Sequence, residues 1–202
     1  MWRLTDEQRE LREEIRGVVR EHIQPRVREI DENCEYPRDL YGVMAEHNLL
    51  GLSVPRKYGG RCDTDVSWCA YVEELAKVSG TVSLMAAYVK LVSLPILLAG
   101  SEEQKQSFLP GLLAGEQLGS FALSEPNVGS DPAALETRAE RHGDVWVLNG
   151  AKRFIGNAGL SDVYVVFART GDPGPKGVSA FLVDGHADGV SSEKLRTMGM
   201  PD

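Results

Sequence analysis

The stretch Phe121-Ala-Leu-Ser-Glu-Pro-Asn-Val-Gly-Ser-Asp131 begins shortly after the pattern of apolar residues changes along the sequence. Before Gly115, apolar residues recur every three or four positions, which is the spacing of one face of an α-helix. From Phe121 onward they alternate with other residues, which is typical of β-strands. No long amphipathic helix interrupts this later part. We therefore predict an α+β fold, with an N-terminal all-α helical domain over residues 1–115 and an antiparallel, β-barrel-like domain over residues 116–202.

Five helices are predicted in the first domain from periodicity and from signals at helix ends. Thr5 with Gln8, and Ser101 with Gln104, have the spacing of capping boxes, in which side chains and backbone groups at a helix start satisfy one another. The predicted helices cover residues 5–24, 37–50, 64–78, 81–99 with a kink or break near Pro95, and 101–112. The second of them is expected to turn Leu40, Val43, Met44 and His47 inward.

Strands in the second domain are predicted around residues 121–123, 145–147, 163–168 and 178–182. Two turns are predicted between such segments, at His142-Gly143-Asp144 and at Asn149-Gly150. Asn-Gly is the strongest short hairpin signal, because both residues of that turn need positive φ angles. After this turn, the chain is expected to continue into a strand that contains Phe154 and Gly156.

Composition excludes several classes of protein. At 202 residues, with 42% apolar residues, 26% charged residues and a formal net charge of −8, the chain resembles soluble globular proteins. It has no stripe of Lys and Arg of the kind that binds a phosphate backbone, so we expect no nucleic-acid partner. The four histidines have no metal-ligand spacing, and no metal site is predicted.

The predicted location is cytoplasmic. The N-terminus is acidic where a signal peptide would need an apolar core. The apolar run from Thr81 to Ala99 is interrupted by Lys90 and Pro95, so we expect a buried helix and no membrane span. The three cysteines, an odd number without CxxC spacing, are interpreted as reduced thiols.

Two segments of the second domain carry residues suited to a ligand. In the stretch that follows Phe121, Gly129 would let the backbone approach a ligand, and Ser130 offers a hydroxyl and an N–H to a diphosphate. In Asn149-Gly-Ala-Lys-Arg-Phe-Ile-Gly-Asn-Ala158, Phe154 could stack on a flat ring while Gly156 brings the main chain close to its edge. Each segment also has an ordinary interpretation, as a surface turn and as a barrel residue with a bulge.

Taken together, the chain closely resembles the acyl-CoA dehydrogenase family of flavoproteins. Three places carry the resemblance: Val54-Pro55 followed by Tyr58-Gly59-Gly60, the Leu-Ser-Glu-Pro-Asn-Val-Gly-Ser-Asp loop from Leu123, and the Asn-Gly-Ala-Lys run from Asn149 with Ile155 and Asn157. The resemblance extends over essentially the whole chain. It implies a helical domain followed by a β-barrel-like middle domain, and FAD as cofactor.

The resemblance also implies site residues. Those expected beside the flavin ring are Phe121, Leu123 and Ser124 in one segment, and Phe154, Ile155 and Gly156 in the other. Gly129 and Ser130 are expected to contact the diphosphate, and Ser130 also the acyl-CoA. Two positions depart from the family, which usually has Thr or Ser at Gly156 and often Trp at Phe154. We expect a main-chain group or a water molecule to replace the missing hydroxyl near flavin N5.

The activity that the resemblance implies is α,β-dehydrogenation of an acyl thioester in fatty acid metabolism. In the family a glutamate removes the α-proton, and that glutamate would lie beyond Asp202. Glu125, in a tight loop beside Pro126, is interpreted as a structural hydrogen-bonding residue and not as the base. This chain alone is therefore expected to be inactive.

The implied partners are an acyl-CoA or acyl-carrier-protein thioester and an electron-transfer flavoprotein or other acceptor. The protein is also expected to form a homo-oligomer or to bind a partner chain that carries the C-terminal helical domain. An alternative is a non-catalytic subunit that keeps this fold as a scaffold for another chain. A third possibility is an unrelated helical-plus-β binding module.

Overall fold

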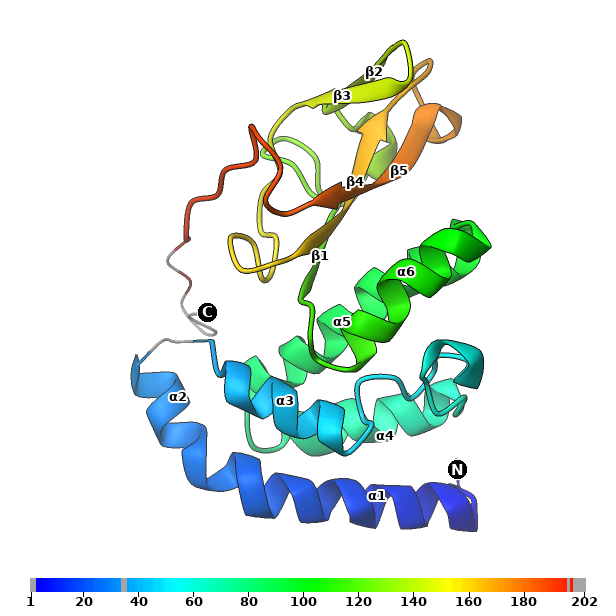
Figure 1. The fold of residues 1–202 in the computed structure, drawn as a ribbon. Helices are drawn as coiled ribbons and strands as arrows, with labels where there is room; N and C mark the ends of the chain where they lie inside the picture. The colour runs from blue at the N-terminus through cyan, green and yellow to red at the C-terminus, as the bar shows by residue number, and fades with distance from the viewer. Residues whose placement is uncertain (1–2, 34–35, 196, 198–202) are drawn as a thin grey trace. The chain divides into compact units, whose positions relative to one another are not determined.

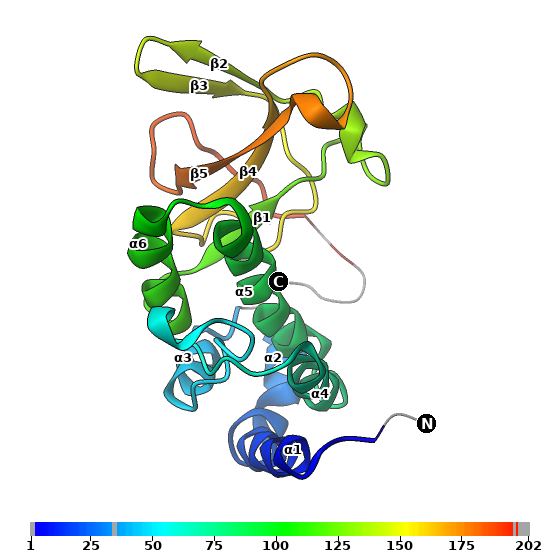
Figure 2. The same cartoon turned by 90° about the vertical axis from the view of Figure 1, so that its right-hand side faces the viewer.

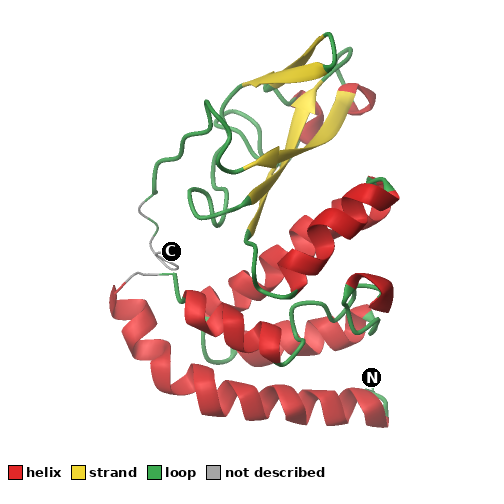
Figure 3. Cartoon of the chain, viewed as in Figure 1, coloured by secondary structure: helices red, strands yellow, loops and turns green. Residues whose placement is uncertain are grey.

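The structure of the chain is a computed structural model that describes residues 3–33, 36–195 and 197. Its α-helices all precede its first strand. Figure 3 distinguishes the helices, in red, from the strands, in yellow. The described chain divides into two compact units, one ending at Gln117 and the other spanning Leu118–Leu195. The boundary thus falls after Gln117, two residues beyond the predicted boundary after residue 115. The predicted order of a helical part and then a sheet part is confirmed.

The α-helices of the first unit are labelled in Figure 1. They are α1 (Asp6–Val18), α2 (Val27–Asn33), α3 (Arg38–Glu46), α4 (Asp65–Ala76), α5 (Gly80–Ala99) and α6 (Glu102–Leu113). Both predicted capping boxes are present: Thr5 and Gln8 cap α1, and Ser101 and Gln104 cap α6. Thr64 caps α4, because its hydroxyl accepts a hydrogen bond from the N–H of Ser67.

The first predicted helix proves longer than expected. It was expected to end at Gln24, but the chain continues through a π-helical turn, Val19–Ile23, and a 3₁₀ turn, Gln24–Arg26, into α2. Pro25 lacks the N–H that an α-helix would use, so the hydrogen-bond pattern changes there, and Figure 1 shows the chain bending between α1 and α2.

Two details of the helix predictions were wrong. His47 is exposed, because α3 ends at Glu46 and the chain then turns away. Of the predicted kink or break at Pro95, the break is wrong, because α5 is continuous from Gly80 to Ala99. Ile96, which is 2% exposed, packs the last turn of α5 into the core and holds it in place.

The core of the helical unit forms where α1, α3, α4, α5 and α6 pack together. Tyr71 on α4 and Met44 on α3 are both fully buried, and the Tyr71 hydroxyl lies 2.9 Å from the Met44 sulfur. Glu74 on α4 is also buried, where it pairs with Arg12 and Arg16 of α1. Charged groups are rarely buried without such partners.

Helix α5 is the one helix of the described residues that is long and apolar enough to cross a membrane. Nine of its residues, among them Val82, Met85 and Ile96, are buried within the helical unit. A core helix of a soluble protein passes the same test of length and composition. The expectation that no segment spans a membrane stays a prediction.

The second unit is one sheet of five strands. They are β1 (Gly119–Ala122), β2 (Arg138–His142), β3 (Val145–Asn149), β4 (Val163–Arg169) and β5 (Val178–Asp184). The order is β1-β4-β2-β3, and β5 also pairs with β4. Val163, Val165 and Ala168 of the central strand β4 are at most 1% exposed, as its continuous apolar sequence predicted.

The sheet is mixed, so the prediction of a purely antiparallel barrel was wrong. β1 and β4 are parallel, with Gly119 opposite Val163, while β4 and β5 are antiparallel. Parallel strands need a long crossover, usually a helix. Here residues 123–162 supply it with loops and the β2–β3 hairpin.

Of the two predicted turns, one forms a hairpin: the turn at Gly143-Asp144 joins β2 and β3, whereas the hairpin predicted at Asn149-Gly150 was wrong. Figure 2 shows the β2–β3 hairpin, in which β3 has β2 as its one ladder partner in the described chain. Val145, Trp146 and Val147 of β3 are 42–61% exposed. Residues 150–160, which were expected to contain a strand, form turns and irregular backbone.

Candidate cofactor site

The loop after β1 is a tight turn closed by two backbone hydrogen bonds. The Glu125 N–H donates to the Val128 carbonyl at 2.9 Å, and the Val128 N–H donates to the Glu125 carbonyl at 3.2 Å. Pro126 and Asn127 lie exposed at its tip, and Gly129 follows directly. The turn therefore presents the backbone after Val128 to solvent.

Glu125 holds this turn from inside the unit. Its side chain is 1% exposed and accepts hydrogen bonds from the N–H groups of Glu136 (2.6 Å) and Thr137 (3.0 Å) and from Lys152 Nζ (2.8 Å). Burial alone would raise the pKa of Glu125, but the hydrogen bonds from Lys152, Thr137 and Glu136 outweigh it and hold the pKa at about 2. Such a carboxylate is a poor proton acceptor, which agrees with the structural role inferred from the sequence.

The second segment, residues 152–157, runs beside residues 119–124 in the opposite direction. At one end, Lys152 Nζ donates to the Leu123 carbonyl at 3.2 Å and the Arg153 N–H donates to the Ser124 carbonyl at 2.9 Å. At the other end, Asn157 Nδ2 donates to the Gly119 carbonyl at 3.1 Å. Figures 1 and 2 both place this yellow stretch next to β1. The structure thus brings together the two segments that the sequence singled out.

The eight predicted site residues all keep some access to solvent. Half-buried are Phe121, Leu123, Ser124, Ile155 and Gly156, and exposed are Gly129, Ser130 and Phe154. The six residues predicted beside the flavin ring lie on the two adjacent segments. Gly129 and Ser130 lie beyond the 125–128 turn and have no hydrogen bond to the second segment among the described residues.

Phe154 has an unusual backbone. Its φ angle is 59°, in the left-handed region that bulky residues avoid, and the residue is 70% exposed. The Arg153 guanidinium lies 4.9 Å from the centre of its ring. A strained aromatic residue that contributes little to the core is typical of a functional position.

Gly129 lies where a ligand could approach. A Cβ at this position would meet no atom of the chain within 4 Å, and its backbone is not left-handed. Nothing within the unit therefore requires glycine at this position. In the described part of the chain, the N–H groups of Gly129 and Ser130 make no hydrogen bond. Free N–H donors beside an open glycine fit a diphosphate group.

The carbonyl group of Gly156 accepts a hydrogen bond from the buried hydroxyl of Ser120. Ser120 Oγ donates to it at 2.7 Å and lies 2.7 Å from Ser161 Oγ. Both serines are at most 3% exposed. Because residue 156 is glycine, it has no side-chain hydroxyl, and it can bind a ligand only through its main-chain groups.

Sequence reasoning missed the residues that support the two segments: Ser120, Lys152, Ser161 and Arg169. The Arg169 guanidinium is buried and donates to the carbonyl groups of Ala133, Leu135, Asp172 and Gly174. The available signal was a lysine or arginine within or directly after a predicted strand, because such residues are seldom buried unless they are paired.

Two protein-family models match the sequence, one over each part of the chain. Residues 5–116 match the acyl-CoA dehydrogenase N-terminal domain, and residues 120–202 match the acyl-CoA dehydrogenase middle domain. The chain belongs to the acyl-CoA dehydrogenase family. The resemblance inferred from the sequence motifs is therefore confirmed.

Individual relatives agree with this assignment. A probable acyl-CoA dehydrogenase of Mycobacterium bovis, fadE25, is 38% identical over 206 residues, covering 100% of this chain and 53% of the relative. The crystal structure of a probable acyl-CoA dehydrogenase from Mycobacterium abscessus has a TM-score of 0.92 at 34% identity, over 98% of this chain and 53% of that one. A glutaryl-CoA dehydrogenase from Mycobacterium smegmatis, solved in complex with FADH2, has a TM-score of 0.91 at 31% identity, over 98% and 50%.

The 202-residue chain thus spans about half the length of the curated relatives it matches. This half contains both family domains that the sequence motifs indicated.

Proposed function

We propose that the protein is an FAD-dependent oxidoreductase that dehydrogenates an acyl thioester to its 2-enoyl product. The observation that carries this proposal is the antiparallel contact between residues 119–124 and 152–157, which places the exposed ring of Phe154 and the half-buried Phe121 on neighbouring segments. The relative from Mycobacterium smegmatis that binds FADH2 shares this fold, which supports FAD as the cofactor.

The residues of this chain fit the parts of FAD. The main-chain groups of Leu123, Ser124 and Gly156 would hold the ring system, with Phe154 against its face. The N–H groups of Gly129 and Ser130 would hold the diphosphate. When bound, FAD supplies the acceptor for the hydride that leaves the β-carbon of the substrate.

The catalytic base in this proposal is a glutamate supplied by polypeptide outside residues 1–202. The thioester α-proton is a weak acid, so its removal needs a free carboxylate near the substrate. Glu125, the buried acid of this site, already accepts bonds from Lys152 and two backbone N–H groups. Its pKa of about 2 makes it unsuited to that task.

The test of cofactor binding is a titration of the 202-residue chain with FAD, followed by flavin absorbance and fluorescence. We expect a complex with the wild-type chain. Gly129→Val should weaken it at least about tenfold, because the added methyl groups fill the approach to the backbone, while stability stays unchanged because that space is open. Gly42→Ala, at another open glycine in the helical unit, serves as the control.

A wild-type chain that stays colourless in excess FAD, with no ring bound at either segment, would overturn the proposal. Turnover of an acyl thioester with an artificial electron acceptor by residues 1–202 alone would overturn the external base. A chain that binds FAD but supports no turnover even with a longer relative's C-terminal domain supplied would favour the scaffold alternative.

The proposal also names a substrate class and an electron acceptor. An acyl-CoA or an acyl-carrier-protein thioester would be the substrate, and a carrier flavoprotein would take the electrons. We also propose a cytoplasmic location and assembly with further copies or with a partner chain.

A further inference from the structure

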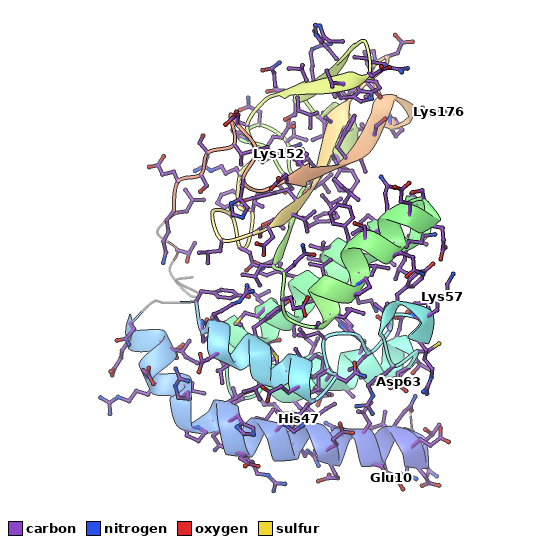
Figure 4. All side chains as sticks on the ribbon, viewed as in Figure 1. Glu10, His47, Lys57, Asp63, Lys152 and Lys176 are labelled. Carbon is purple, nitrogen blue, oxygen red and sulfur yellow. The ribbon has the colours of Figure 1, made fainter. Side chains whose placement is uncertain are left out.

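Lys152 occupies an uncommon place in the β unit. Its side chain is 13% exposed, and Figure 4 shows it within the unit, whereas Lys176 lies at its outer end. A lysine ammonium carries three N–H donors and no acceptor, so a buried lysine needs three partners. Burial lowers the pKa of Lys152, and the neighbouring Glu125 carboxylate opposes that effect.

The three donors have three acceptors from three parts of the chain. Lys152 Nζ lies 2.6 Å from the Phe167 carbonyl on β4, 2.8 Å from Glu125 Oε1 and 3.2 Å from the Leu123 carbonyl after β1. The next residue, Arg153, donates its N–H to the Ser124 carbonyl at 2.9 Å. One ammonium group therefore joins the 123–125 loop, the 152–157 segment and the central strand.

Little else attaches the start of the second segment to the first loop. Between residues 152–157 and 123–125, the described chain has one backbone hydrogen bond, that of Arg153 with Ser124. No β-ladder connects them. The spacing of the two segments at this end therefore depends on Lys152.

We propose that Lys152 is a positioning residue for the flavin: it fixes the spacing between residues 123–125 and 152–156, the two segments between which the ring is held. This inference rests on the proposed function. Lys152 does not itself touch the ring in this assignment. It acts through the carbonyl groups of Leu123 and Phe167 and through Glu125, which anchors the turn before Gly129.

The first test compares Lys152→Met with Lys176→Met, an exposed lysine of the same unit, in the 202-residue chain. We expect Lys152→Met to lower FAD affinity at least about tenfold and to shift the absorption maxima and midpoint potential of the flavin at saturating FAD. Lys176→Met should leave all three unchanged. A purely structural lysine would change stability without altering the spectrum or potential of the flavin that still binds.

Lys152→Met leaves the Glu125 carboxylate buried without its cation and so could prevent folding. The double variant Glu125→Gln/Lys152→Met removes both charges and provides the folded comparison. We expect it to unfold near the wild-type temperature yet still to bind FAD at least about tenfold more weakly and with a shifted potential. Wild-type affinity and potential in this folded double variant would overturn the proposal.

Amide hydrogen exchange separates this inference from the proposed function. The Arg153 N–H should be protected in the wild-type chain without FAD and should exchange at least about tenfold faster in the double variant. If the wild-type chain binds no FAD, the proposed function fails, and with it the role in holding flavin. The exchange result then decides by itself whether Lys152 fixes the two segments, and equal exchange in both proteins would reject that too.

Discussion

The hydroxyl groups of Ser120 and Ser161 lie 2.7 Å apart in the buried interior of the β unit. Ser120 Oγ also lies 2.7 Å from the Gly156 carbonyl, and Ser161 Oγ lies 3.0 Å from the Asn157 carbonyl. The two hydroxyl groups have two protons between them and make three short contacts: with each other and with the carbonyl groups of Gly156 and Asn157. Through this pair, β1 holds the far end of the segment that Lys152 holds at its near end.

Ser120→Ala should destabilise the β unit by about 1–3 kcal/mol, because it leaves the half-buried Gly156 carbonyl without its donor and removes the buried hydroxyl partner of Ser161. Denaturant unfolding of the chain measures this. The matched control is Ser179→Ala. It removes a hydroxyl that lies 2.7 Å from the Thr170 hydroxyl in an exposed contact. The control should change stability by less than about 0.5 kcal/mol. Equal effects of the two substitutions would contradict the buried role.

The stability of the β unit should fall in acid because of Glu125. Its folded-state pKa of about 2 lies below its ordinary value of 4.5, so the fold favours the charged form. This contribution is fully present above pH 4.5 and is lost as the pH falls toward 2, in total about 3 kcal/mol. Hydrogen exchange of β4 amides between pH 5 and pH 2, about the range of these two pKa values, follows it.

Glu125→Gln should flatten that acid dependence and lower stability at neutral pH. Glu74 of the helical unit provides the comparison, because its pKa is also held at about 2: burial raises it, and bonds from Lys77, Arg16 and Arg12 outweigh the burial. Glu74→Gln should leave the acid response of β4 as in the wild type. A β unit whose response is unchanged by Glu125→Gln would show that the charged form of Glu125 is not favoured by the fold.

Phe154→Asn should stabilise the chain by about 1 kcal/mol, since asparagine tolerates a φ of 59° better than phenylalanine and little buried surface is lost. The same substitution should weaken FAD binding, because a stacking ring is removed. Thermal unfolding and an FAD titration on one preparation measure both effects. A loss of stability would mean that the ring packs more than its exposure indicates.

The two glycines of the Tyr58-Gly59-Gly60 motif should respond differently to substitution. Gly59 has a φ of 92° with open space around it, so Gly59→Asn should cost only about 1 kcal/mol. At Gly60, a Cβ would overlap the Val54 carbonyl, so Gly60→Ala should cost about 3 kcal/mol or more. Urea unfolding ranks the variants, and the reverse order would show that backbone angle, not space, governs this turn.

The helices could be predicted because their signals are local. Thr5 with Gln8 and Ser101 with Gln104 lie within one helical turn of each other, and both capping boxes formed. The parallel pairing of β1 with β4 has no such signal, since its partners are separated by the whole 123–162 connection. Alternation shows that a segment is a strand, but not which neighbour it joins or in which direction.

The absence of a hairpin at Asn149-Gly150 has a specific physical cause. Gly150 was interpreted as a turn residue, but a Cβ there would collide with Thr137, so glycine is needed for close packing. The candidate site shows the same limit. The motifs indicated Phe121 and Phe154, whereas Lys152 acts through partners up to 29 residues away that no local pattern reveals.

The segment from Lys152 to Asn157 is attached to β1 and its loop chiefly at its two ends. Positions 154 and 155 between those ends take no part in strand pairing. Substitutions at these two positions should therefore leave the fold intact, so the surface offered to a ligand can change independently of folding.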